Sequence, residues 1–118
     1  MKLSLYLPNF RDEISVEEID QLTDVAEELK FESIWTLDRI VVPEKSDRGE
    51  LEKPFGMMSE FPNQLPVSSK GNWLQGLPLI PYLAARTKNV RIGVSIIVTP
   101  FRAPTVMAAE IATWDQLS

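Results

Sequence analysis

The chain has 118 residues, with 12 lysines and arginines against 17 aspartates and glutamates, which gives a formal net charge of −5 at pH 7. It contains no cysteine and no histidine, which excludes disulfides, thiolate nucleophiles, Cys-ligated metal sites and Ser-His-Asp relays. The acidic balance provides no broad basic surface for nucleic acid or an anionic membrane. A content of 44% hydrophobic and 25% charged residues is typical of a soluble globular protein, and the length suits one domain.

Membrane insertion and secretion are not expected from the sequence. No stretch approaches the roughly 20 apolar residues of a transmembrane helix. The apolar run that begins at Leu3 is too short for the hydrophobic region of a signal peptide. We therefore expect a cytoplasmic protein without a membrane partner.

The first 37 residues predict a strand, a helix and a second strand. Apolar residues alternate over residues 2–7 until Pro8, as in a half-buried strand. Ser15 and Glu18 have the spacing of a capping box, and the following apolar residues recur at helical steps until about Lys30. Residues 33–37 predict the second strand. A βαβ unit of this length implies parallel strands.

No periodicity survives in the long segment that follows the second strand. Prolines and glycines interrupt residues 44–71, yet the segment contains phenylalanine, methionine and leucine. Loops beyond roughly 12–15 residues are usually functional or disordered. Both an ordered lid and a mobile insertion are compatible with residues 44–71.

Regular patterns return in the last third of the chain. A short helix is expected around residues 79–84, with Pro78 and Pro81 early enough to be tolerated and Asn89 as its C-cap. Residues 90–98 form a nearly continuous apolar run, typical of a strand that is covered on both faces. The last helix is expected to begin at Pro104.

The order of these elements predicts an α/β fold in a single domain over residues 1–118. Two architectures fit it. One is a small open three-stranded sheet. The other is the first three βα units of a (β/α)8 TIM barrel, an incomplete barrel with a long loop after its second strand, since a complete barrel needs about 250 residues.

Several segments resemble the luciferase-like monooxygenase family, whose bacterial-luciferase-type TIM barrels use flavin or the 8-hydroxy-5-deazaflavin coenzyme. They are residues 7–10 (Leu-Pro-Asn-Phe), 34–38 (Ile-Trp-Thr-Leu-Asp), 77–79 (Leu-Pro-Leu), 83–87 (Leu-Ala-Ala-Arg-Thr), 91–94 (Arg-Ile-Gly-Val), 98–104 (Val-Thr-Pro-Phe-Arg-Ala-Pro) and 112–118 (Ala-Thr-Trp-Asp-Gln-Leu-Ser). The resemblance implies the N-terminal part of a flavin- or deazaflavin-dependent oxidoreductase. It is expected to be inactive without the rest of the barrel, and FMN and the deazaflavin remain alternatives.

Two residues depart from the family pattern. Family members often have Asp-His after the second strand, where this chain has Asp38 and Arg39. They also tend to have glycine before the second strand, where this chain has Lys30. If that position requires a positive φ, Lys30 is mildly strained.

The resemblance places the cofactor ring at the C-terminal ends of the strands, where barrel active sites lie. The candidate cofactor-binding residues are Asn9, Asp38, Arg39, Ser95, Ile96 and Ile97, with Phe10 beside the first of them. Each has a structural alternative: a turn for Asn9, a surface ion pair for Asp38 and Arg39, and a plain buried strand for residues 95–97. No residue is assigned a catalytic acid or base role, and no metal site is expected.

Other conspicuous residues are expected to be structural. Trp35 and Trp114 are interpreted as core and helix packing, while Trp73 is open to either role. Arg102, between Pro100 and Pro104, is interpreted as a solvated turn residue. A phosphate role for Arg102 is not expected, because barrel phosphate sites usually lie near the last two strands.

The second hypothesis is a non-catalytic module that associates with itself. Family dimers commonly pair through the second and third helices, and open sheet edges also drive association. A homo-oligomer is therefore expected, formed through these helices or through the sheet edges. A small-molecule substrate is expected only when the barrel is complete.

Overall fold

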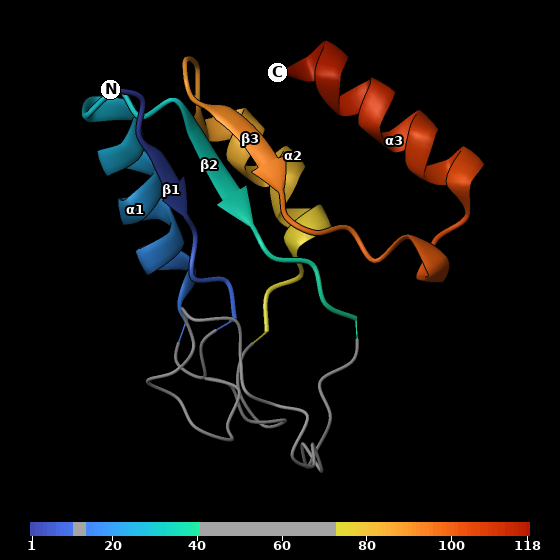
Figure 1. The fold of residues 1–118 in the computed structure, drawn as a ribbon. Coiled ribbons are helices and arrows are strands. Elements are labelled where there is room, and N and C mark those ends of the chain that lie inside the picture. Colours follow the sequence, from blue (N-terminus) through green and yellow to red (C-terminus); the bar gives the residue numbers. More distant parts are fainter. Residues whose placement is uncertain (11–13, 41–72) are drawn as a thin grey trace, which may run out of the picture.

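The computed structural model describes residues 1–10, 14–40 and 73–118. Its strands are β1 (Ser4–Tyr6), β2 (Ser33–Thr36) and β3 (Arg91–Val94), its helices are α1 (Val16–Glu28), α2 (Gly76–Arg86) and α3 (Pro104–Leu117), and Thr99–Phe101 forms a short 3₁₀ helix, η1. The strands form one parallel sheet in the order β1-β2-β3 (Figure 1). The predicted α/β fold with parallel strands is confirmed. The predicted loop over residues 44–71 lies outside the described residues.

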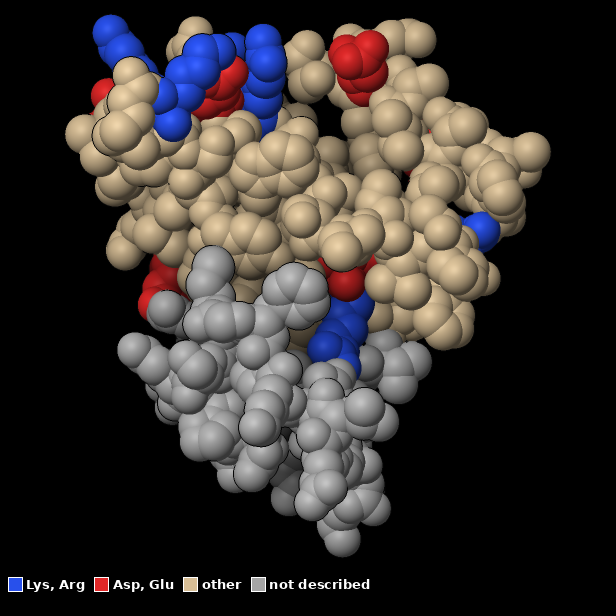
Figure 2. Space-filling view, viewed as in Figure 1, with Lys and Arg blue, Asp and Glu red and all other residues tan. Residues whose placement is uncertain are grey.

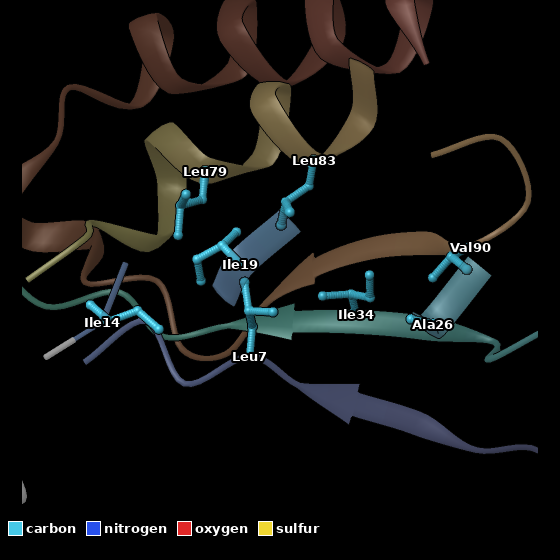
Figure 3. Packing of buried hydrophobic residues seen from close by; sticks show 8 residues of the cluster. All are labelled: Leu7, Ile14, Ile19, Ala26, Ile34, Leu79, Leu83 and Val90. Carbon is cyan, nitrogen blue, oxygen red and sulfur yellow. The ribbon is translucent and has the colours of Figure 1, made fainter. Parts of the chain in front are cut away.

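The helices cover one face of the sheet. Figure 1 shows α1 and α2 behind the strands, with α3 next to α2. Leu5, Ile34 and Ile92 are paired in one row across the three strands and belong to the apolar core or pack against it. Figure 3 shows the buried cluster between sheet and helices, which consists of Leu7, Ile14, Ile19, Ala26, Ile34, Leu79, Leu83 and Val90. None of the described helices covers the opposite face, which we call the open face (Figure 1).

Local signals fix both ends of α1. The predicted capping box is present, because the Ser15 hydroxyl accepts from the Glu18 N–H at 3.1 Å and the Glu18 carboxylate accepts from the Ser15 N–H at 3.4 Å. At the other end, Lys30 has a φ of 55°, and the Lys30 and Phe31 N–H groups donate to the carbonyls of residues 27 and 26. This Schellman arrangement favours glycine. The expected strain at Lys30 is confirmed, at a cost of about 1–2 kcal/mol.

The third strand is shorter and more exposed than predicted. It ends at Val94 instead of continuing to residue 98, and it forms an edge of the described sheet. The ladder stops because β2 itself ends at Thr36, whose carbonyl accepts a last bond from the Ser95 N–H at 2.8 Å. The Ser95–Ile96 peptide bond is cis. The expectation of a strand covered on both faces is wrong for this sheet, since one face of β3 is open.

The helix before β3 also differs from its prediction. It ends at Arg86 with Thr87 as the C-cap, so the prediction of Asn89 as the cap is wrong. Asn89 instead donates through its backbone and its side chain to the carboxylate of Glu27, at 2.9 and 3.1 Å. Pro81 lies beyond the first turn of α2, where a proline removes one helical hydrogen bond.

Glu27 ties the end of α1 to the turn before β3. Its carboxylate accepts the backbone N–H groups of Lys88, Asn89 and Val90 at 2.7, 2.9 and 3.1 Å. These bonds, the Asn89 backbone bond first, lower the pKa of Glu27 from 4.5 to about 2. A carboxyl whose pKa is lower in the folded state stabilises the fold at pH values above its unfolded-state pKa. This stabilisation is lost as the pH falls toward the folded-state pKa.

We expect Glu27→Gln to lower the free energy of unfolding by about 1 kcal/mol at pH 7. The effect is no larger because the Glu27 carboxylate is partly exposed, and solvent screens its interactions. The difference from wild type should shrink by roughly half or more at pH 3, because much of the stabilisation of the folded state by the Glu27 carboxylate is lost there. Urea denaturation at both pH values measures it. Glu28→Gln, which removes the same charge from an exposed neighbour, is the control. A difference that does not depend on pH would contradict this assignment.

Candidate functional site

The C-terminal ends of the parallel strands meet at one edge of the sheet, and the predicted site residues follow these ends. A hollow of about 370 Å³ lies there, lined by Leu37, Asp38, Arg39, Ile40, Ile96, Val98 and Phe101. Of the predicted residues, the structure brings Asp38, Arg39 and Ile96 together around this hollow. Asn9, Ser95 and Ile97 do not line it.

The walls of the hollow are mostly apolar, and three of their apolar side chains are exposed. Ile96 is 78% exposed, Phe101 64% and Ile40 40%. Exposed apolar side chains that gather around a concavity with a few polar groups are typical of small-molecule sites, whose volumes are roughly 300–1,000 Å³. The hollow therefore has the size and lining of a site for a largely apolar small molecule.

Asp38 lines the hollow and connects the segment after β2 to the segment after β3. Its side chain is completely buried and forms a bidentate pair with Arg102, with both N–O distances at 2.7 Å. One carboxylate oxygen of Asp38 also accepts the Val98 N–H at 2.9 Å. The same Arg102 nitrogen that contacts this oxygen donates to the Val98 carbonyl at 3.2 Å.

These contacts correct two sequence interpretations. Asp38 does not form a surface ion pair, because its carboxylate is buried against a guanidinium from the other side of the hollow. Arg102 is not a solvated turn residue, since its side chain is only 17% exposed. The sequence offered no signal for the pairing, because the two residues are separated by 64 positions and have no motif spacing.

Asn9 has a buried, fully bonded side chain. Its amide nitrogen donates to the carbonyls of Leu37 and Leu74 at 2.8 and 2.6 Å, and its amide oxygen accepts the Leu37 N–H at 2.9 Å. Asn9 lies in a turn, as its structural alternative had it, but its side chain bonds to other segments and does not cap its own backbone. The side chain joins the ends of β1 and β2 to the segment that enters α2. Its predicted contact with a cofactor stays a prediction.

Ser95 is held against the first strand as well as the second. Its carbonyl accepts the Tyr6 hydroxyl at 3.2 Å, in addition to the bond from its N–H to Thr36. This fixes the start of the segment that contains Ile96 and Ile97. The structure leaves Ile96 exposed, so residues 95–97 are not a plain buried strand.

Trp35 differs from its predicted role. Trp35 is 38% exposed and lies on the open face of the sheet, where its ring covers Gly93 and its indole N–H donates to Ser33 at 2.8 Å. Its assignment to core and helix packing is wrong, because residue 35 points away from the helices. The ring centroids of Trp73 and Phe10 lie 6.0 Å apart, near the end of β1.

Trp114 lines a second, larger hollow of about 540 Å³ between α2, β3 and α3. Its other lining residues include Ile80, Ala84, Ile92 and Ile111. None of the predicted site residues lines it, and it extends along the beginning of β3 rather than its end. We attribute this larger hollow to the loose packing of α3 against α2 and β3, since α3 has no buried residue.

Charge is distributed unevenly over the open face of the sheet. Figure 2 shows an uncharged surface across the middle of this face, with charged side chains gathered mainly along the edge where the strands begin. Ion pairs of Glu32 with Lys2 and Arg91 lie at that edge, at 2.7 and 3.8 Å. The uncharged middle of the face carries Tyr6 and Trp35, which are paired neighbours in the sheet.

Within residues 1–10, 14–40 and 73–118, no three acidic side chains approach closely enough to hold a metal ion. Among the helices described, none has the length and apolarity needed to cross a membrane.

Comparison with curated proteins gives no match. The sequence model of one family, described as luciferase-like monooxygenase, matches residues 1–118, which is the whole chain. The resemblance noted from the motifs is confirmed, and three parallel strands with three helices agree with part of such a fold. The chain belongs to the luciferase-like monooxygenase family.

Proposed function

We propose that this chain forms the first three βα units of a luciferase-like (β/α)8 barrel and holds one side of a flavin or deazaflavin ring. The strand order follows the chain order, and α1 and α2 cover the same face of the sheet. A barrel has all its helices outside, whereas a doubly wound sheet has helices on both faces. The open, uncharged face with Tyr6 and Trp35 then corresponds to the barrel interior.

The observation that carries the proposal is the hollow at the C-terminal strand ends. A flavin or deazaflavin bound there would supply two-electron redox chemistry, and the protein would orient the ring and exclude water from it. Ile40, Ile96 and Phe101 offer apolar surface for a flat ring. Arg39 lines the same hollow and offers a guanidinium where family members often have an imidazole.

The phosphate of FMN is not expected to contribute to binding by this chain, because barrel phosphate sites lie near the last two strands. We therefore expect the 118-residue protein to bind lumiflavin, the ring without its phosphate, as well as it binds FMN. Weak ring binding, with a dissociation constant of about 10–1,000 μM, corresponds to about 4–7 kcal/mol. Quenching of flavin fluorescence in a titration with protein measures both ligands.

Two matched variants show whether the hollow is responsible. Ile96→Asp places a charge in the hollow at an exposed position and should abolish quenching, while Ile111→Asp, also exposed, alters the larger hollow and should leave quenching unchanged. Absence of saturable binding by the wild-type protein, or equal effects of the two variants, would contradict the proposal. The same titration is repeated with an 8-hydroxy-5-deazaflavin ring. The ring that binds more tightly, flavin or deazaflavin, indicates which cofactor the site prefers.

A second candidate function is self-association without catalysis. β1 and β3 are the two edges of the described sheet, and α3 exposes Val106, Ile111 and Leu117. Unpaired strand edges and exposed apolar residues favour pairing with another copy. Sedimentation of a tight oligomer that binds neither ring would favour this alternative. For either function we propose a cytoplasmic location, which the amino-acid composition supports.

A further inference from the structure

We infer that the Asp38–Arg102 pair is a positioning device that sets the separation between the two walls of the ring-binding hollow. This inference rests on the function proposed above and adds a role for two residues that need not touch the ring. It starts from the observation that the hollow lies between segments that belong to different strands.

The two walls come from the chain after β2 and the chain after β3. Residues 37–40 form the first wall, and residues 96, 98 and 101 form the second. The backbone ladder between β2 and β3 ends with the bond from Ser95 to Thr36. Beyond this bond, Asp38 connects the walls, because its carboxylate holds both the Val98 N–H and the Arg102 guanidinium.

Both members of the pair are engaged with each other and with the Val98 backbone. The Asp38 carboxylate has no exposed surface, and each of its oxygens accepts a bond from Arg102. The terminal nitrogens of Arg102 are used by Asp38 and by the Val98 carbonyl. The pair therefore acts on a ligand through the side chains that it positions, Ile96, Val98 and Phe101, which line the hollow.

The chemistry of the pair suits this task. A bidentate guanidinium–carboxylate contact fixes orientation as well as distance, which a lysine ammonium cannot do. A rigid ring gains affinity when the walls of its site are ordered before it binds, because less side-chain and loop ordering is then required. Loosening the pair should weaken ring binding even if the fold and the charges are retained.

Arg102→Lys tests the inference in the 118-residue protein, with lumiflavin as the probe. The matched control is Arg86→Lys, because Arg86 pairs with Asp20 and Asp24 at 3.3 and 3.1 Å between α1 and α2, away from the hollow. We expect Arg102→Lys to weaken lumiflavin binding at least five-fold and Arg86→Lys to leave it unchanged. Amide hydrogen exchange at Val98, measured without ligand, should accelerate in Arg102→Lys and stay unchanged in Arg86→Lys.

A second variant separates positioning from folding. The double substitution Asp38→Asn with Arg102→Gln removes both charges together, so that no unpaired charge remains buried. It should fold, and it should show the same loss of affinity and the same faster exchange at Val98. Wild-type affinity in both Arg102→Lys and the double variant would overturn the inference and leave the proposed function intact. Failure of the wild-type protein to bind lumiflavin would overturn the proposed function, and the inference with it.

Discussion

Replacing Asn9 by alanine is expected to cost about 3–5 kcal/mol of unfolding free energy and to leave little folded protein. The Asn9 side chain is completely buried and bonds to three backbone groups, the N–H and carbonyl of Leu37 and the carbonyl of Leu74. Each buried backbone group that loses its partner costs about 1–3 kcal/mol, and the removed side chain leaves a cavity. The total is a large part of the stability of a typical small domain.

The measurement is urea denaturation followed by circular dichroism, with Asn89→Ala as the matched control. Asn89 is exposed and its side chain bonds to Glu27, so its loss should cost only about 0.5–1 kcal/mol. Asn9→Asp tests the bonding pattern itself, since a carboxylate of the same shape would face two carbonyls that require donors. A stable Asn9→Asp variant would show that the amide does not hold these strand ends together.

Gly76→Ala is expected to destabilise the protein by about 2–3 kcal/mol, although alanine is the better helix former. A Cβ at residue 76 would lie 2.5 Å from the carbonyl oxygen of Leu37 and 2.7 Å from its carbonyl carbon. These are backbone atoms at the end of β2, so the first turn of α2 would have to move away. The bond from the Thr36 hydroxyl to the Gly76 carbonyl, at 3.2 Å, would be disturbed as well.

Gly93→Ala is the matched comparison, because its added Cβ would meet the Trp35 ring at 2.7 Å. That ring lies on the open face and can swing outward, so we expect a smaller loss of stability together with a change in tryptophan fluorescence. Urea denaturation monitored by both circular dichroism and fluorescence compares the two variants. Equal losses of stability in the two variants would contradict this account, in which the fixed backbone of Leu37 excludes a side chain at residue 76 more strictly than the Trp35 ring does at residue 93.

Local features of the fold were predictable because their causes lie within a few residues. The capping box of Ser15 and Glu18 and the start of α3 at Pro104 depend on neighbours in the sequence, whereas the strain at Lys30 was expected from the glycine that family members tend to have there. The parallel sheet followed from the alternation of strands and helices. The end of β3 was not predictable from its own apolar run, because it depends on where β2 stops.

The site was predictable in its place but not in its contacts. The ends of parallel strands meet at one edge, so Asp38, Arg39 and Ile96 could be expected together. Asp38 pairs with Arg102, 64 positions away, and Asn9 bonds to Leu37 and Leu74, 28 and 65 positions away, and no spacing in the sequence reports such contacts. For Trp35, apolarity suggested the core, but the period of the strand placed it on the open face.

The central claim is that the hollow at the C-terminal strand ends binds a flavin-type ring. A titration of ¹⁵N-labelled protein with lumiflavin, followed by amide chemical shifts, tests it most directly. We expect the largest changes at residues 37–40, 96, 98 and 101, which line this hollow. Changes confined to the larger hollow around Ile80, Ile92 and Trp114, or no changes at saturating ligand, would contradict the claim.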